Sequence, residues 1–173
     1  MLLNRPRGFS LVELMVTVAV LATVLAIGVP SMRTFVENGR IRAAGESWQY
    51  GLTLARNEAV RLNLPVAFVV DVSGWRVQRA TDNTVLHRGS GKESTKGLDL
   101  RIDPEDASTV TYDSFSRVIP NRDGSEPIEM VDIGAARPPG SAGYRPLRLQ
   151  LLSGGLVRLC DPAAEDDDPR KCL

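Results

Sequence analysis

Few side chains in this chain could do catalytic chemistry. The single histidine, His87, is far in sequence from the only two cysteines, Cys160 and Cys172. Catalysis by a serine–histidine–aspartate or cysteine–histidine arrangement therefore has little to build on. The sequence also lacks a glycine-rich phosphate loop after a strand and a metal-spaced cluster of histidines and cysteines. We therefore predict no catalytic residue, no cofactor and no metal site.

Carboxylates gather in two places, 103–106 and 165–168. Both clusters fall in predicted loops with proline nearby, where solvated surface is the simplest interpretation. The second cluster leaves calcium binding as the less favoured alternative, because it lacks the spaced oxygen ligands and the glycine of a dedicated calcium loop.

Cys160 and Cys172 are close together at the C-terminus. If the domain lies outside the cytoplasm, a disulfide is the default expectation, and two free thiols are the alternative. The bridge would close a loop of about a dozen residues and contribute ~3 kcal/mol in the chain-entropy model.

One further carboxylate stands in a costly position. Glu13 is the only charged residue from Phe9 to Val29, a run that is long enough as a helix to cross roughly 30 Å of hydrocarbon. A carboxylate in lipid costs ~2.5–3.5 kcal/mol, so Glu13 indicates a function with a partner. Arg5 and Arg7 precede the run and predict that the C-terminus lies outside the cytoplasm. A cleaved secretory signal and a simple anchor are the alternatives.

The residues around Glu13 also carry a family resemblance. The sequence Arg-Gly-Phe-Ser-Leu-Val-Glu-Leu at 7–14, with its apolar run, resembles the class III signal of type IV prepilins and pseudopilins. The resemblance implies that a prepilin peptidase cleaves between Gly8 and Phe9, that Phe9 is N-methylated, and that Glu13 pairs with the new α-amine on its own or a neighbouring subunit. Pro30 stands where many pilins place a helix-kinking proline.

The amphipathic pattern after Pro30 predicts helical structure that leads into the head, and Pro30 itself is expected to bend or break the helix. Apolar residues recur every three or four positions, and the opposite face is polar, which indicates packing against a globular head. The helix should end near Asn63, because Pro65 disfavours helical geometry at Leu64. The apolar positions are Ile41, Ala44, Trp48, Leu52, Ala55, Ala59 and Leu62.

Beyond Pro65 the pattern changes to period two with many β-branched residues. Two hairpins are predicted, one from residues 66–72 and 75–79 and the other from 145–152 and 156–160. Further strands are predicted at 85–88, 98–102, 109–112 and 128–133. We therefore expect an α+β fold in which a long N-terminal helix packs against antiparallel β-sheets of a C-terminal globular head.

The expected organisation has four parts. These are a leader peptide at 1–8, a transmembrane or filament-core helix at 9–30, an amphipathic helix at 31–64, and a β-rich head at 65–173. The layout resembles the minor-pilin and pseudopilin subgroup often labelled GspH/FimT, including its FimU-like members. Type IV pilins commonly have a C-terminal disulfide loop, and the pair Cys160 and Cys172 looks like one.

Some members of this subgroup act in DNA uptake, and their last hairpin resembles Gly-Arg-x-Arg. Here the matching positions 155–158 read Gly-Leu-Val-Arg, so the first arginine is a leucine. Arg145, Arg148 and Arg158 remain as candidates for phosphate contacts. The near-neutral composition and the acidic tail disfavour DNA binding, which is therefore the runner-up.

The resemblance implies a minor pilin at or near the tip of a type IV pilus, which primes pilus assembly. Its expected partners are the prepilin peptidase, the major pilin and other minor pilins. Its expected location is the inner membrane, with one membrane-spanning helix and a periplasmic head. The alternatives are a DNA-binding pilin for transformation and a GspH-like minor pseudopilin of a type II secretion system.

Overall fold

The computed structural model describes residues 9–71, 74–89, 98–134, 143–152 and 154–172. The chain divides into two compact units, Met1–Val36 and Glu37–Leu173, and each is described by itself. Helix α1, Leu11–Leu62, contributes its first part to the N-terminal unit and its second part to the head. Every strand belongs to the head.

A C-terminal cap explains where α1 ends. Asn63 adopts a left-handed conformation with φ of 52°. Its amide donates to the carbonyl of Val60, and the amide of Leu64 donates to the carbonyl of Ala59. This pair of hydrogen bonds is the Schellman arrangement, which satisfies carbonyl groups left free by the last turn. Pro65 then follows, so the helix cannot continue.

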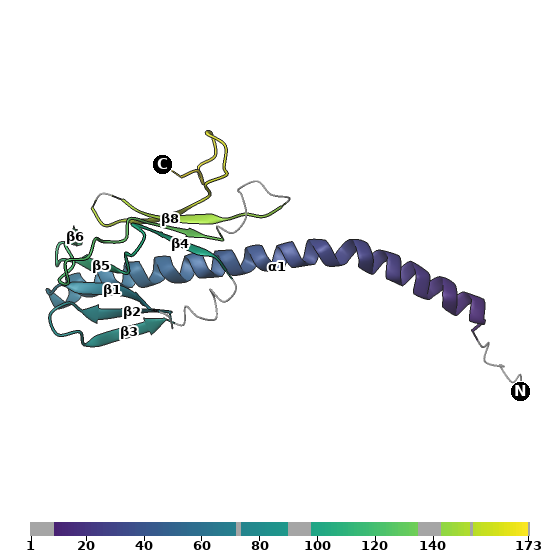
Figure 1. The fold of residues 1–173 in the computed structure, drawn as a ribbon, viewed down its shortest axis with the longest axis horizontal. Helices are drawn as coiled ribbons and strands as arrows, with labels where there is room; N and C mark the ends of the chain where they lie inside the picture. Colours follow the sequence, from purple (N-terminus) through teal and green to yellow (C-terminus); the bar gives the residue numbers. More distant parts are fainter. Residues whose placement is uncertain (1–8, 72–73, 90–97, 135–142, 153, 173) are drawn as a thin grey trace, which may run out of the picture. The chain divides into compact units, whose positions relative to one another are not determined.

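The strands of the head form two antiparallel sheets (Figure 1). The five-stranded sheet has the order β3-β2-β1-β5-β6, and the four-stranded sheet has the order β4-β7-β8-β9. The strands of the first sheet are β1 (Val66–Asp71), β2 (Gly74–Arg79), β3 (Val85–Gly89), β5 (Thr109–Tyr112) and β6 (Val118–Ile119). Those of the second sheet are β4 (Leu100–Asp103), β7 (Met130–Ile133), β8 (Leu147–Leu151) and β9 (Val157–Cys160).

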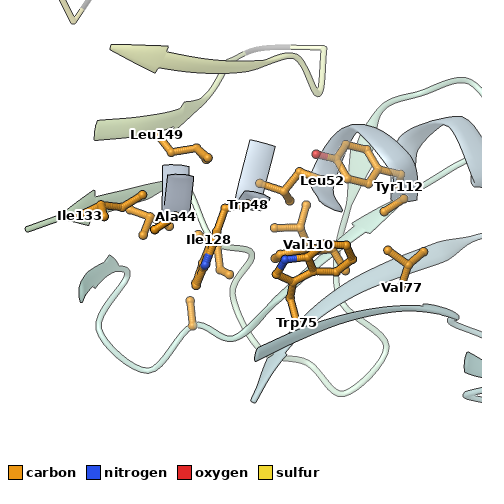
Figure 2. Packing of buried hydrophobic residues seen from close by; sticks show 14 of the residues in the cluster. Ala44, Trp48, Leu52, Trp75, Val77, Val110, Tyr112, Ile128, Ile133 and Leu149 are labelled. Carbon is orange, nitrogen blue, oxygen red and sulfur yellow. The ribbon is translucent and has the colours of Figure 1, made fainter. Parts of the chain in front are cut away.

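Both sheets pack on the same stretch of α1 (Figure 2). Small helix residues allow the strands to approach closely. A Cβ atom added at Gly51 would lie 2.7 Å from the ring of Phe68 in β1 and 2.9 Å from the indole of Trp75 in β2. One added at Gly45 would lie 2.9 Å from Leu159 in β9. Both sheets therefore pack against this one helix.

The predicted apolar stripe of the helix is largely buried. Ile41, Ala44, Trp48, Leu52, Ala55 and Ala59 are buried in the core, and Leu62 packs against it while partly exposed. Aromatic rings continue this core into the first sheet, because the ring of Phe68 lies 5.9 Å from that of Trp48 and 5.7 Å from that of Trp75. The predicted α+β class is confirmed.

The strand predictions agree with the structure, with small shifts. Strand β4 begins two residues later than predicted, β7 is shorter at its N-terminal end, and the two-residue strand β6 was not predicted. The loops expected between residues 89 and 97 and between 135 and 143 fall almost entirely outside the described residues.

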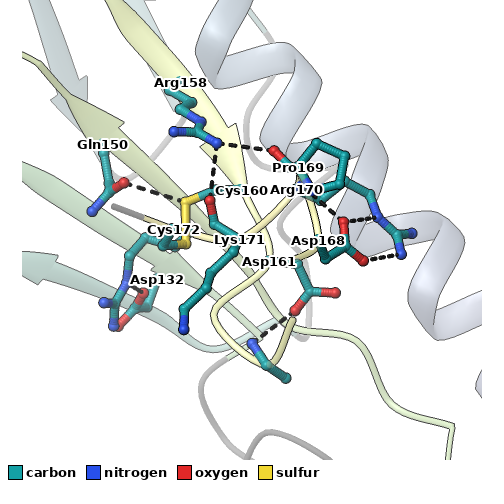
Figure 3. The surroundings of a disulfide bond; sticks show 12 residues. Asp132, Gln150, Arg158, Cys160, Asp161, Asp168, Pro169, Arg170, Lys171 and Cys172 are labelled. Atoms are coloured by element: carbon teal, nitrogen blue, oxygen red, sulfur yellow. Dashed lines mark hydrogen bonds and ion pairs between the residues drawn. A yellow bond between two sulfur atoms is a disulfide. The ribbon is translucent and has the colours of Figure 1, made fainter. Parts of the chain in front are cut away.

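The C-terminal tail is fastened to β9 by a disulfide and by hydrogen bonds (Figure 3). Cys160 is bonded to Cys172, and the amide of Asp161 donates to the carbonyl of Arg170. The side chain of Arg158 donates to the carbonyls of Pro169 and Lys171, at 3.0 Å each. Within the tail, hydrogen bonds from Arg170 lower the pKa of Asp168 to about 2.

Two glycines on α1 provide a matched test of helix packing. Gly51→Ala should destabilise the head, because overpacking costs ~1–3 kcal/mol, which exceeds the ~1 kcal/mol gained in helix propensity. Gly39→Ala should stabilise it by ~1 kcal/mol, because an added Cβ meets nothing within 4 Å. Urea unfolding of the full chain in detergent, followed by the fluorescence of Trp48 and Trp75, measures both. Changes of the same sign would contradict the packing.

Removing the bridge with Cys160→Ser and Cys172→Ser should lower the free energy of unfolding by ~3 kcal/mol, because the unfolded chain loses its constraint. The sequence separation between the two cysteines is 12 residues. The same denaturation measurement applies. Reductant should shift the wild-type protein to the midpoint of the double variant and leave the variant unchanged. A wild-type protein insensitive to reductant would contradict a stabilising role of the bridge.

Candidate functional site

The N-terminal segment begins α1 with a side-chain cap. The hydroxyl of Ser10 accepts a hydrogen bond from the amide of Val12 at 3.3 Å, and Glu13 lies in the first turn. A carboxylate at this position interacts favourably with the positive end of the helix dipole. Gly8 lies outside the described residues, so the predicted cleavage between Gly8 and Phe9 stays a prediction.

The described side chains from Phe9 to Val29 are all exposed within this chain. Their apolar character is strong, with a mean hydropathy of 2.4 over the best window of 18 residues. The hydroxyls of Thr17 and Thr23 donate to the carbonyls of Leu14 and Ala19 on the same helix, which satisfies them without water. By length and composition this helix can cross a membrane, and its surface requires a cover of lipid or protein.

The spacing of Phe9 and Glu13 sets what this segment can do. Cleavage after Gly8 would place a cationic amine at Phe9, four residues before the carboxylate. Such an amine could balance Glu13 in apolar surroundings, either in the same chain or between neighbours. This pairing stays a prediction. So does the kink at Pro30, although the helical assignment of α1 includes that residue.

The three candidate arginines for DNA are used in different ways. Arg148 forms a two-point ion pair with Asp132 on the adjacent strand β7, at 2.6 and 2.9 Å. The hydrogen bonds to Asp132 raise the pKa of Arg148 above its usual value. Arg158 holds the C-terminal tail, as described above. Arg145 is exposed, and its backbone amide donates to the side chain of Asn38.

The sequence did not single out a cluster that joins α1 to β3. Glu58 is largely buried and accepts hydrogen bonds from Arg61 at 2.6 and 3.0 Å, while His87 lies 3.4 Å away. The hydrogen bonds from Arg61 are the largest cause of the lowered pKa of Glu58, and burial opposes them. The three-residue spacing of Glu58 and Arg61 on a helix is a sequence signal for an ion pair. The proximity of His87 to Glu58 depends on the tertiary structure, so the sequence alone does not predict it.

A cavity of about 570 Å³ lies on the face of the first sheet opposite α1. Asn121, which is buried, donates to the carbonyls of Thr109 and Ser125 and accepts from the hydroxyl of Thr111. The side chain of Arg122 also lines the cavity and donates to the carbonyls of Ala80 and Thr81. These groups fasten the loop after β6 to the sheet, which gives them a structural role.

Comparison with known proteins gives two family matches along the chain. Residues 3–29 match the prokaryotic N-terminal methylation motif. Residues 44–167 match the model of the type II transport protein GspH. A comparison with curated proteins finds no match.

A solved structure is also similar, the minor pseudopilin EpsH from the Type 2 Secretion System of Vibrio cholerae. Its sequence identity is 19% and its TM-score is 0.49, over 72% of this chain and 99% of that chain. The family assignment does not depend on this likeness. It follows from the GspH match, which spans well over half of the chain and most of the head. The chain therefore belongs to the family of the type II transport protein GspH.

Proposed function

We propose that this protein is a minor pseudopilin, a structural subunit of the pseudopilus of a type II secretion system. The observation that carries the proposal is the presence in one chain of the methylation motif at 3–29 and the GspH match at 44–167. The first indicates processing and assembly through the N-terminal helix. The second is a family that takes its description from type II transport. The role is structural, and no reaction is assigned to the head.

The proposed sequence of events uses the N-terminal segment directly. A prepilin peptidase removes residues 1–8 and Phe9 is methylated. The apolar part of α1 holds the protein in the inner membrane, with the head in the periplasm. Assembly then transfers the exposed apolar surface of this helix from lipid to neighbouring helices. Glu13 sets the register, because its carboxylate is costly in apolar surroundings unless it meets the amine of Phe9.

A minor pilin at or near the tip of a type IV pilus is the second candidate. It is favoured by the Cys160–Cys172 loop, because such loops are common in type IV pilins. In that case the partners are the major pilin and other minor pilins. DNA uptake has less support, since Arg148 and Arg158 already bind groups within the head.

Two variants test the proposed assembly. Gly8→Ala should block cleavage, and Glu13→Ala should remove the partner of the new amine. Both proteins should remain in the membrane and enter filaments at least tenfold less than the wild type, since a pairing worth ~1.4 kcal/mol corresponds to a factor of ten. Sheared filaments and membranes are compared by immunoblotting. Glu46→Ala, which removes an exposed acid farther along α1, is the control. Normal incorporation of Glu13→Ala would refute the pairing.

Deleting the gene in the strain that carries it separates the two candidate systems. We expect loss of secreted enzymes from the medium with surface pili retained, because a pseudopilus serves secretion. Restoration by the wild-type gene, but not by the gene for Gly8→Ala, ties the defect to processing. Loss of pili with intact secretion would instead establish the second candidate.

A further inference from the structure

Exposed apolar side chains of the described head gather at one end. Besides Tyr50, the large apolar residues that are exposed in the described part of the chain from Glu37 onward are Val60, Leu64, Phe115 and Leu156. Val60 lies in the last turn of α1, and Leu64 follows the end of the helix. This is the end of the head farthest along α1 from Glu37.

Strand pairing and turn contacts bring the other two residues to the same end. Val66, where the chain leaves the helix, pairs with Tyr112, so the turn that carries Phe115 starts beside the helix end. A Cβ atom added at Gly155 would lie 2.5 Å from the carbonyl oxygen of Ser116. The turn before Leu156 therefore packs directly against the turn that carries Phe115. We call Val60, Leu64, Phe115 and Leu156 the distal surface.

Phe115 is held in its exposed position by its turn. The carboxylate of Asp113 accepts hydrogen bonds from the amides of Phe115 and Arg117, at 2.9 Å each, and from the guanidinium of Arg117. The same guanidinium lies 5.4 Å from the centre of the Phe115 ring. Phe115 is nevertheless 77% exposed. A rigid aromatic residue beside an arginine loses little entropy on binding and is typical of protein interfaces.

Arg56 adds a positive charge that has no partner among the described residues of the head. It is one helical turn before Val60, is only partly exposed, and makes no hydrogen bond or ion pair among the described residues. Its Nε atom is buried without a hydrogen-bond partner. The hydroxyl of Tyr112, which interacts with it electrostatically, is also buried without a partner. An arginine in this state favours a carboxylate brought by another molecule.

We propose that the distal surface docks against the head of a different subunit of the same assembly, one that offers an apolar socket and a carboxylate for Arg56. This rests on the proposed function, because it takes the protein to be one of several subunits. A second copy meeting this surface face to face would bring Arg56 against Arg56, and the carboxylate that it carries on the turn of Phe115, that of Asp113, is already paired with Arg117. Charge complementarity therefore selects a different subunit over a second copy.

Site-specific photo-crosslinking in the native strain tests the docking. A photoreactive phenylalanine analogue replaces Phe115 in the full chain, and Tyr50 in a matched control on the side of the head. We expect an adduct at position 115, identified by mass spectrometry as another protein with a prepilin N-terminal motif, and none with that protein at position 50.

Substitutions test the same contact without the analogue. Phe115→Ser and Arg56→Glu should each reduce recovery of that subunit with the purified protein at least tenfold. Phe115→Leu and Tyr50→Ser should retain it. Because Phe115 is exposed, the thermal midpoint of Phe115→Ser should equal that of the wild type, which separates docking from folding.

The outcomes distinguish the two proposals. If the wild-type protein enters filaments but position 115 gives no adduct, or an adduct only with a second copy, the docking is overturned and the proposed function stands. Full recovery of the subunit with both Phe115→Ser and Arg56→Glu would likewise overturn the docking and leave the proposed function standing. If the wild-type protein is neither cleaved nor assembled, the proposed function fails and the docking fails with it.

Discussion

Burial of one helix stripe is the constraint on which the whole head depends. Strands from both sheets pack against α1 between Ile41 and Ala59, and the stripe combines one large ring, Trp48, with alanines. Gly45 and Gly51 lie beside this stripe and bring Leu159 and Trp75 close to the helix backbone. Each sheet buries its apolar face against α1, so the head does not depend on a long interface between the two sheets. A loss of packing at this stripe therefore affects both sheets at once.

The N-terminal part of the same helix obeys the opposite rule. All of its described side chains as far as Val29 are exposed. They are apolar except for those of Ser10, Glu13, Thr17 and Thr23. The threonine hydroxyls are satisfied by the helix itself, whereas Glu13 needs a partner once water is removed. An apolar surface with a single charge suits exchange between two apolar surroundings. Lipid and a bundle of neighbouring helices differ little for leucine and valine, so a polar group can decide which one is preferred.

Periodicity predicted the parts of the fold that depend on local patterns. The stripe from Ile41 to Ala59 and the hairpin of β1 and β2 follow directly from spacings of 3.6 and 2 residues. Strand β6 was not predicted, because two residues are too few to show a periodic pattern. Its pairing with β5 depends on the tertiary structure. The interactions that Arg148 and Arg158 make could not be predicted from the sequence either. Their partners, Asp132 and the tail carbonyls, become neighbours only when the second sheet has formed.

The position of Leu156 connects the sequence pattern with the surface of the head. In the hairpin pattern associated with DNA uptake this position is an arginine, which would give the turn beside Gly155 a second cation for phosphate. Here the leucine removes that charge and adds apolar area beside Phe115, while Arg158 is engaged by the C-terminal tail. A polyanion loses one cationic contact at position 156, and a protein surface gains an apolar one. The presence of leucine at position 156 therefore disfavours binding of nucleic acid and favours contact with a protein at this end of the head.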